Sequence, residues 1–320
     1  MLCPNCRRPM RDWLEMPLDA KKDAETPFRA TVRCSACGLG AVHPSPRPDE
    51  VPALYSLSSY YTHGASHIRP VTARLLDRVL VRLAWQADRA RPFDVEDVAA
   101  KLPPGGTVLD LGCGDAETLE LFARQGFDVL GVDPDARSRE QAAARGVTVL
   151  DGTAEAPPAA LEGRRFDLVI MSHSLEHCLD PTAAVASVAR LVAPGGLAYI
   201  EVPNAGCAHF RTFRQCSEMF DSPRHLWFFT PEALEAVAIG AGLRVGEWRF
   251  NGYTRHFKPS WRAWEREIHD RLRRRGWSGG AKRHTLLRSF GLLARTAFAR
   301  APRKYDSVGV LATVAPVRAA

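Results

Sequence analysis

The feature that most constrains the fold of this 320-residue chain is a glycine turn that directly follows an apolar strand pattern. The turn reads Asp110-Leu111-Gly112-Cys113-Gly114-Asp115-Ala116 and leads into a helical segment over 118–125. Glycine lets the backbone turn tightly and approach a ligand closely, and the first turn of a helix presents free N–H groups. Taken alone, such a loop is typical of a nucleotide-binding site, but also of a simple tight turn.

Strands and helices alternate on both sides of this turn. Apolar runs of strand type occupy 108–111, 128–133, 147–150, 166–171 and 197–202, with helical segments between them. This alternation predicts a parallel sheet that is covered by helices on both faces. A helix is expected at 231–241, and further strands at 243–250 and 307–314.

Polar side chains stand where the predicted strands end, namely Asp110, Asp133, Asp151 and Ser172. Ligands of open α/β sheets bind at the carboxyl ends of the strands. Asp133 follows the glycine turn by roughly twenty residues, where a carboxylate can accept hydrogen bonds from both ribose hydroxyls of an adenosine. The turn and Asp133 together therefore indicate a ligand that contains adenosine.

Four of the eight cysteines form two knuckles, Cys3-x2-Cys6 and Cys34-x2-Cys37. Paired thiolates at this spacing predict one tetrahedral, structural zinc ion, with a redox pair or incidental thiols as the alternatives. The other four cysteines are scattered and read as ordinary buried or loop thiols. We expect five segments: a zinc ribbon (1–47), a helical linker or lid (48–103), a core (104–251), a basic helical insertion (252–304) and the final strand of the core (305–320).

These motifs make the sequence resemble the class I S-adenosylmethionine-dependent methyltransferases. The resemblance rests on segments in the family's order: Val108-Leu109-Asp110-Leu111-Gly112-Cys113-Gly114, Gly131-Val132-Asp133, Asp151-Gly152-Thr153-Ala154, Phe166-Asp167-Leu168-Val169 and Pro194-Gly195-Gly196. It covers about 104–250, and the last strand rejoins at 307–317. It implies an α/β, Rossmann-like sheet of seven strands whose last strand is antiparallel.

The resemblance also implies which residues hold S-adenosylmethionine. Gly112 and Gly114 would pass close to its methionine part, Asp133 would bind the ribose, and Asp151 with Gly152 and Thr153 would lie along the adenine. Asp110, Cys113, Pro134 and Ser172 complete the expected cofactor-binding set. The sequence departs from the family at Ala116, where a third glycine is usual. A dinucleotide oxidoreductase is disfavoured, because Glu117 would repel a pyrophosphate.

The amino-terminal part looks like a bacterial subgroup that joins a zinc ribbon to this core. Members of that subgroup include sugar C-methyltransferases and enzymes of glycan or secondary-metabolite pathways, so the acceptor is inferred by analogy alone. Tyr60 and Tyr61 either cover the cofactor or pack the entry helix, which is expected from Val71, Leu75, Val79 and Leu83 at helical spacing.

Two histidines are candidates for the catalytic base. A hydroxyl or carbon acid must lose a proton as it gains the methyl group, and an imidazole of near-neutral pKa suits this task. His225, in the loop after the fifth predicted strand, is the first candidate and His177 the second. A structural hydrogen-bonding role is the alternative for both histidines. Glu176 is open to a helix-start, cofactor-side or catalytic role.

The positive charge of the chain is concentrated in one segment. Residues 258–304 hold 14 Lys and Arg against Glu265, Glu267 and Asp270, while the rest of the chain is slightly acidic. Three interpretations remain open. The first is an amphipathic helical pair that packs on the sheet through one apolar face, formed by Leu286, Phe290, Leu293 and Ala297. The others are a contact with an anionic or lipid-linked substrate or membrane surface, and RNA binding. Nucleic acid is disfavoured, since the charge does not extend to the ribbon.

The sequence therefore predicts a methyltransferase that acts on an oxygen or carbon of a small-molecule, sugar, glycan or lipid-linked acceptor. The alternatives are a ribosomal RNA methyltransferase and a non-catalytic S-adenosylmethionine-binding protein. Residues 1–8 lack the apolar region of a secretory signal, and no apolar run reaches the ~18 residues of a membrane span. We expect the protein in the cytoplasm, or peripherally at the inner face of the membrane.

Overall fold

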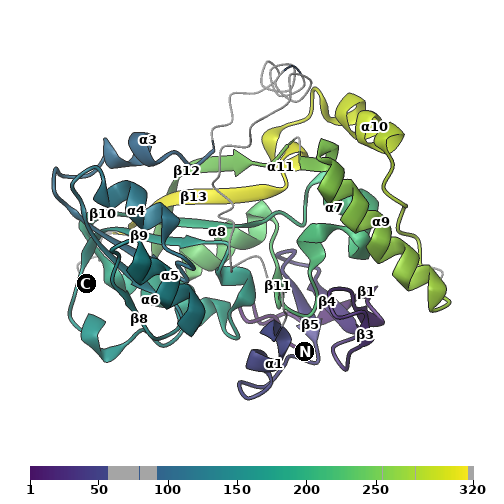
Figure 1. Ribbon diagram of the computed structural model, residues 1–320, viewed down its shortest axis with the longest axis horizontal. Coiled ribbons are helices and arrows are strands. Elements are labelled where there is room, and N and C mark those ends of the chain that lie inside the picture. Colours follow the sequence, from purple (N-terminus) through teal and green to yellow (C-terminus); the bar gives the residue numbers. More distant parts are fainter. Residues whose placement is uncertain (57–78, 80–91, 254, 278, 316–320) are drawn as a thin grey trace.

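A seven-stranded sheet forms the centre of the molecule in the computed structural model, which describes residues 1–56, 79, 92–253, 255–277 and 279–315 (Figure 1). The strand order is β12-β13-β10-β9-β6-β7-β8. The strands are β6 (Thr107–Leu111), β7 (Asp128–Val132), β8 (Val149–Leu150), β9 (Phe166–Ser172), β10 (Val192–Pro203), β12 (Leu243–Asn251) and β13 (Ser307–Val314). Only β13 is antiparallel to its neighbours in this sheet. The predicted fold class is confirmed.

Helices cover both faces of the sheet because successive strand residues point to opposite sides. Val108, Leu168 and Ile170 pack on one face against α3 (Val95–Ala99), α4 (Glu117–Ala123) and α5 (Ala136–Ala144). Leu109 and Val169 pack on the other face against α6 (Pro181–Leu191) and α8 (Pro231–Gly240). The buried strands are therefore apolar on both sides, as expected for a parallel sheet.

Side-chain caps fix where α6 and α8 begin. The Asp180 carboxylate accepts hydrogen bonds from the N–H groups of Thr182 at 2.9 Å and Ala183 at 3.0 Å. Thr230 caps α8 in the same way, by accepting from the N–H of Ala233. Each cap is followed by a proline in the first turn, where a missing N–H costs no helical hydrogen bond.

The amino-terminal ribbon shares a sheet with the core. Its strands β1 (Met10–Glu15), β4 (Ala30–Cys34) and β5 (Gly40–His43) continue into β11 (Trp227–Phe228), a strand of the core, in the order β1-β4-β5-β11. A hairpin of β2 (Leu18–Asp19) and β3 (Ala24–Glu25) and the short helix α1 (Val51–Tyr55) complete this part. The ribbon is therefore built into the core rather than tethered beside it (Figure 1).

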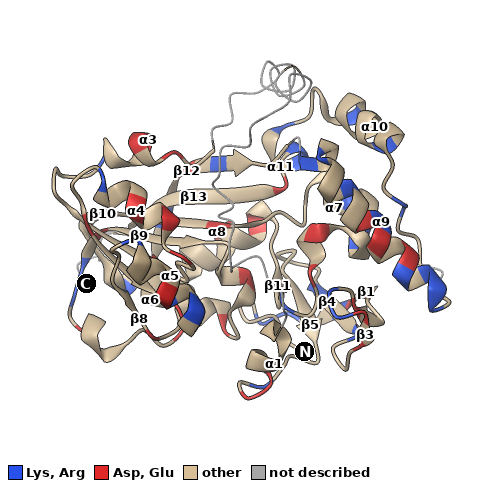
Figure 2. Ribbon diagram, viewed as in Figure 1, with Lys and Arg blue, Asp and Glu red and all other residues tan. Residues whose placement is uncertain are grey.

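The segment before β13 is helical, as predicted. It contains α9 (Pro259–Arg274), α10 (Leu286–Thr296) and α11 (Ala301–Lys304). Basic residues lie along α9, with acidic ones among them (Figure 2). Several arginines are paired: Arg275 with Asp23 of the ribbon, and Arg283 with Asp270.

The buried face of α10 differs from the predicted one. Leu286 and Phe290 are 47% and 41% exposed, while Ser289, Leu292 and Thr296 face inward. The expected apolar stripe therefore does not pack on the sheet as a whole. The Ser289 and Thr296 hydroxyls form hydrogen bonds with buried side chains. The buried face of α10 is therefore shifted by one residue relative to the predicted apolar face.

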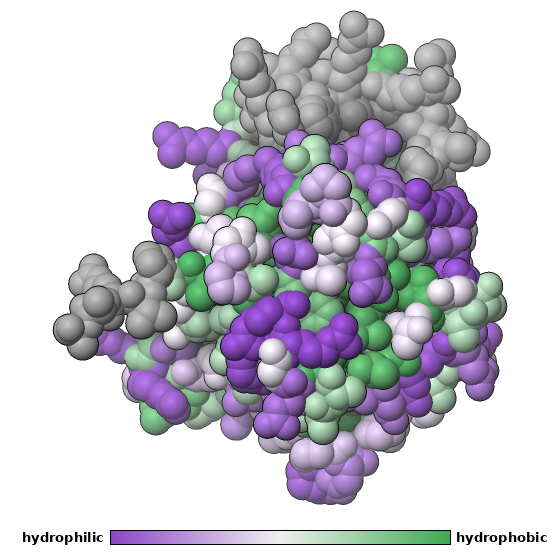
Figure 3. All heavy atoms as spheres, turned by 90° about the vertical axis from the view of Figure 1, so that its left-hand side faces the viewer, coloured by the Kyte–Doolittle hydropathy of each residue, from purple (hydrophilic) through white to green (hydrophobic). Residues whose placement is uncertain are grey.

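Of the predicted helical stretch before the core, α1, α3 and Val79 lie within the described residues. Tyr60, Tyr61, Val71, Leu75 and Leu83 lie outside them. Within the described part of the chain, no helix combines the length and the apolar character needed to cross a membrane. Figure 3 looks onto the side away from the ribbon and the insertion, where hydrophilic and hydrophobic side chains are intermixed.

Candidate active site

The glycine turn after β6 is shaped by a close contact with the segment after β9. Gly112 adopts φ +82°, and a Cβ atom there would lie 2.5 Å from the Cβ of Ser174. The Ser174 hydroxyl donates a hydrogen bond to the carbonyl of Leu111 at 2.8 Å. Gly114, with φ +55°, has no atom within 4 Å of the equivalent Cβ position. The turn is thus closed on one side and open to a ligand on the other.

Ala116 occupies the position where the resemblance expects a third glycine. Its φ of 59° lies in the left-handed region that glycine prefers, and its methyl group is fully buried. The turn therefore keeps its glycine-like backbone with a methyl group in place.

Asp133 lies directly after β7 and joins the glycine turn by hydrogen bonds. Its carboxylate accepts from the N–H of Gly114 at 2.8 Å and from the N–H of Asp135 at 2.9 Å. Burial raises the pKa of Asp133. The structure thus brings the turn and the predicted ribose-binding carboxylate together at the same edge of the sheet.

Asp110 adds a second buried carboxylate beside Asp133. Burial raises the pKa of Asp110 to about 8, and the charge of Asp133 adds to the rise. Its Oδ1 atom has no hydrogen-bond partner among the described residues. Two neighbouring carboxylates with an orphaned oxygen suit a cationic ligand, and S-adenosylmethionine carries a sulfonium and an ammonium group. Cys113 lies between them in the turn, and burial raises the pKa of its thiol.

The predicted adenine side is more exposed. Arg139 donates from Nη1 to the carbonyl of Asp133 at 2.9 Å and to the Asp151 carboxylate at 3.1 Å. Thr153 accepts a hydrogen bond from the N–H of Ala156 at 3.2 Å. Pro134 is exposed next to Asp133, and a Cβ on Gly152 would touch Pro158 at 2.8 Å. These residues border the same edge of the sheet, but their side chains are engaged with the protein itself.

The two predicted bases, His177 and His225, lie together. Their ring centroids are 4.8 Å apart. His225 Nδ1 lies 3.0 Å from the carbonyl oxygen of Met219, which only accepts, so Nδ1 carries the proton and Nε2 the lone pair. His177 Nδ1 lies 3.0 Å from the carbonyl of Arg224 and 2.9 Å from the Tyr55 hydroxyl. The backbone therefore fixes the orientation of His225 with Nε2 free to take a proton.

Glu176 supplies the negative charge beside the two histidines. Burial alone would raise its pKa, but the hydrogen bond from His173 and the charges of the three nearby histidines hold it at about 2. Burial, and then the charge of His177, lower the pKa of His225 to about 4. Burial also lowers the pKa of His177. His225 is thus neutral at physiological pH, and the nearby Glu176 carboxylate would stabilise its protonated form.

Glu176, His177 and His225 each offer one ligand atom, and these atoms lie within 4.8 Å of one another. The same three groups are therefore able to hold a divalent cation. Backbone contacts place the trio beside the cofactor edge: the N–H of Leu226 donates to the Glu176 carbonyl at 2.8 Å, and Ser174, two residues earlier, touches Gly112.

Comparison with known proteins decides the family. Residues 84–247, just over half of the chain, match the family described as "Methyltransferase domain". The chain belongs to this family. It is an S-adenosylmethionine-dependent methyltransferase with the class I fold.

Curated relatives include the ubiquinone biosynthesis O-methyltransferase of Cereibacter sphaeroides, 32% identical over 179 residues, which make up 52% of this chain and 70% of that protein. The protein of the same name from Sinorhizobium medicae is 34% identical over 178 residues, or 52% of this chain and 72% of that protein. A solved S-adenosylmethionine-dependent methyltransferase from Archaeoglobus fulgidus aligns with 73% of this chain and 92% of its own, at 18% identity and a TM-score of 0.47.

A buried ion cluster holds the histidine loop of this methyltransferase against the ribbon. The guanidinium of Arg224 is fully buried and donates two hydrogen bonds of 2.7 Å to Asp19 and one of 3.0 Å to Asp221. Lys21 Nζ lies 2.7 Å from Asp221. The opposite charges of Lys21 and Arg224 outweigh the effect of burial and lower the pKa of Asp221. No sequence signal links Asp19 to Arg224.

Glu201 on β10 is a further site residue that sequence reasoning missed. Its carboxylate accepts hydrogen bonds from the hydroxyls of Tyr199 at 2.9 Å and of Ser172 at 3.3 Å. His173 Nε2 lies 3.9 Å from Oε1 of the same carboxylate. The usable signal was a single carboxylate within the apolar run 197–202, next to the predicted strand end at Ser172.

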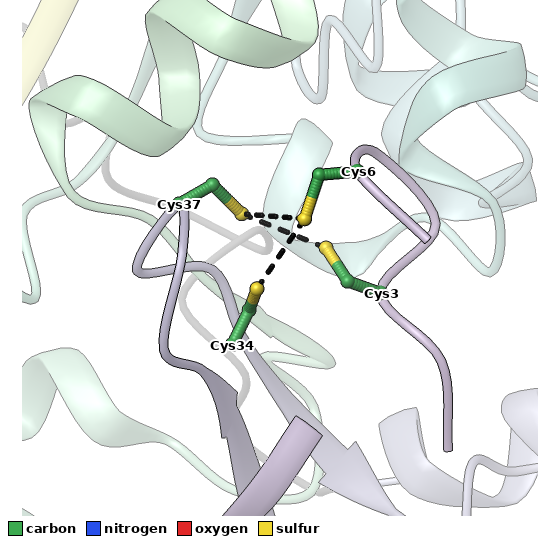
Figure 4. Close-up of side chains that lie close together, drawn as sticks. All are labelled: Cys3, Cys6, Cys34 and Cys37. Atoms are coloured by element: carbon green, nitrogen blue, oxygen red, sulfur yellow. Dashed lines mark hydrogen bonds between the residues drawn. The ribbon is translucent and has the colours of Figure 1, made fainter. Parts of the chain in front are cut away.

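The Sγ atoms of the four ribbon cysteines converge (Figure 4). The Sγ atoms are 3.5 Å apart for Cys3 and Cys37, 3.4 Å for Cys6 and Cys34, and 3.9 Å for Cys6 and Cys37. A tetrahedral zinc ion with bonds of about 2.3 Å requires sulfur atoms about 3.8 Å apart. The four sulfurs therefore fit the predicted metal site.

The two knuckles have matching backbones. The N–H groups of Arg7 and Gly38, four residues after the first cysteine of each knuckle, donate to the carbonyls of Cys3 and Cys34. Both residues adopt positive φ values, 59° and 78°. Burial raises the pKa of Cys3 to about 12, a cost that a metal ion would offset.

Proposed function

We propose that this protein transfers a methyl group to an oxygen of a small-molecule acceptor, with His225 as the general base. The observation that carries the proposal is the fixed ring of His225: the Met219 carbonyl holds the proton on Nδ1, which leaves Nε2 as the acceptor. The relatives named O-methyltransferases support oxygen rather than carbon as the methylated atom.

When bound, S-adenosylmethionine supplies the methyl group and leaves as S-adenosylhomocysteine. Gly112, Gly114, Asp110 and Asp133 would hold it, since they form an open turn beside two buried carboxylates. His225 Nε2 would take the proton of the acceptor hydroxyl as that oxygen is methylated. The Glu176 carboxylate then stabilises the imidazolium, because the two groups lie in the same buried cluster.

The test compares His225→Gln with wild type, using labelled cofactor and a panel of phenols and carbohydrate hydroxyls. We expect turnover to fall by about 10²–10⁴-fold with unchanged affinity for S-adenosylhomocysteine. His43→Gln, an exposed histidine of the ribbon, serves as the matched control and should keep full activity. Unchanged turnover in His225→Gln would remove His225 from the role of base, and methylation of carbon only would overturn the oxygen assignment.

We also propose that Cys3, Cys6, Cys34 and Cys37 bind one structural zinc ion. The Sγ distances and the matching knuckle backbones support a closed four-thiolate site, in which no position remains for water. A closed site offers no coordination position to a substrate, so the metal would act on stability rather than on chemistry. Metal analysis of purified protein should show this zinc, and its loss in Cys34→Ser should lower the melting temperature.

A third proposal concerns the place where the protein meets its acceptor, which we infer to be an anionic membrane surface. The outward face of α10 and the residues after it is apolar, with Leu287 81% and Phe298 95% exposed beside exposed Arg288 and Arg295. An interfacial helix has this combination of apolar side chains and basic flanks. The acceptor would then be lipid-linked.

Vesicle flotation tests the membrane proposal. We expect wild type to float with phosphatidylglycerol vesicles in low salt and not with phosphatidylcholine vesicles, and the double variant Leu287→Glu, Phe298→Glu to lose binding. Binding to ribosomal RNA fragments with no vesicle binding would instead favour the RNA alternative. Equal flotation of the variant and wild type would refute the assignment of this face.

A further inference from the structure

A second cluster of buried histidines lies outside the candidate active site. His209 on α7 (Ala208–Phe213), Glu265 on α9 and His284 just before α10 converge, and each side chain is at most 5% exposed. His256, in the short turn before α9, is also buried, and its ring centroid lies 6.0 Å from that of His209. We call these four residues the histidine cluster.

Glu265 is the centre of the histidine cluster. Its Oε1 atom lies 2.7 Å from His209 Nε2 and accepts hydrogen bonds from the Trp261 indole at 3.0 Å and the Glu218 N–H at 2.9 Å. Its Oε2 atom contacts His284 Nδ1. One ligand atom from each of His209, Glu265 and His284 lies within 4.8 Å of the others.

The contacts of His284 are compatible with a bound cation. The Ser289 hydroxyl donates to the His256 carbonyl at 2.8 Å and lies 2.9 Å from His284 Nε2, which donates to Ser289 when the ring is protonated there. A neutral His284 with its proton on Nε2 turns the Nδ1 lone pair toward the Glu265 carboxylate. Two acceptors then face each other in a buried site, which is unfavourable unless a proton or a metal cation lies between them.

Two further observations agree with a cation. His256 Nε2 is buried and has no hydrogen-bond partner among the described residues. A bond from His284 Nε2 to Ser289 also matches the way metal-binding histidines are oriented through their second nitrogen.

We propose that His209, Glu265 and His284 bind a divalent cation of the zinc type. Imidazole and carboxylate are the ligands that zinc prefers besides thiolate. The ion would join α7, which follows β10, to α9 and to the segment just before α10. Because the Glu218 N–H also contacts Glu265, the ion would anchor the loop 217–225 that carries His225.

The experiment measures metal content and the spectrum of cobalt-substituted protein. We expect wild type to bind one metal ion more than the ribbon accounts for, with a second, weaker visible spectrum that lacks thiolate-to-cobalt charge transfer. Glu265→Gln and His284→Gln should each lose one equivalent of metal and keep the thiolate band of the ribbon. His269→Gln, at the histidine of α9, which lies outside the cluster, should keep both metals.

Three outcomes would overturn the proposal. Wild type with metal at the ribbon alone would mean that a metal-free imidazolium holds the cluster together. A second equivalent that survives both Glu265→Gln and His284→Gln would place the metal elsewhere, such as at Glu176, His177 and His225. A cobalt spectrum of the wild type that contains only thiolate coordination would also overturn the proposal. This measurement uses the wild type alone, so it holds even if the variants fail to fold.

Discussion

The contact between Asp19 and Arg224 gives the sharpest prediction about how the ribbon supports the active site. Asp19 accepts two hydrogen bonds of 2.7 Å from a fully buried guanidinium, and Arg224 directly precedes His225 in the chain. Neutralising one partner of a buried ion pair costs about 3–5 kcal/mol. Since Asp221 still pairs with Arg224 and an asparagine keeps one acceptor, we expect Asp19→Asn to lower the free energy of unfolding by about 2–3 kcal/mol.

Urea unfolding and thermal melts measure this change, and turnover reports on the loop. A loss of about 2–3 kcal/mol corresponds to a fall in melting temperature of about 3–5 °C for a chain of this size. We expect kcat to fall while the affinity for S-adenosylhomocysteine is unchanged, because Asp19 is not in contact with the glycine turn. Asp12→Asn, an exposed carboxylate on β1, is the matched control. If the free energy of unfolding of Asp19→Asn lies within about 0.5 kcal/mol of that of the wild type, the argument from the buried ion pair is wrong.

Three other predictions follow from the site and the ribbon. Gly112→Ala should weaken binding of S-adenosylhomocysteine at least about tenfold, since the new methyl group meets Ser174. Gly126→Ala is the control, because Gly126 has a similar φ of +87° but open space around it, and it should leave the affinity unchanged. Equal affinities of the two variants would contradict this prediction. The pKa of His225 is lowered to about 4 in the folded protein, so the unfolded chain binds more protons than the folded one between about pH 6.5 and 4. The free energy of unfolding should therefore decrease as the pH falls through this window, by on the order of 2 kcal/mol between pH 7 and 5. His225→Gln should flatten this dependence in urea unfolding, and a slope equal to that of wild type would count against the burial argument. Removal of metal from the ribbon by a strong chelator should lower the melting temperature, and an unchanged melt after confirmed metal loss would speak against a structural role.

The fold of the core could be read from the sequence because its signals are short-range. Apolar runs of strand length, their alternation with helices and the glycine turn each lie within a few residues, and the structure confirms the sheet that they predict. The paired cysteines are also local in each knuckle, and the two knuckles converge as expected. The caps at Asp180 and Thr230 are of the same kind.

The inward face of α10 shows where a local pattern was not enough. The apolar periodicity favoured Leu286 and Phe290 as buried residues, yet Ser289 and Thr296 face inward. Their hydroxyls meet His284 and Tyr253, whose positions depend on other segments of the chain. Polar partners of this kind have no periodicity, so the sequence offered no means to choose between the two faces.

The sequence by itself determined the sheet, the glycine turn with Asp133 at its edge, and the four-cysteine cluster, since all of these follow from residue type and spacing over short distances. The tertiary structure alone decided the proton on His225, the joining of β11 to the ribbon, the pairing of Asp19 with Arg224 and the convergence of the histidine cluster. Each of these depends on contacts between segments that lie far apart in the chain. Such contacts are set by packing, because a buried charge or donor must find a partner wherever the fold places one.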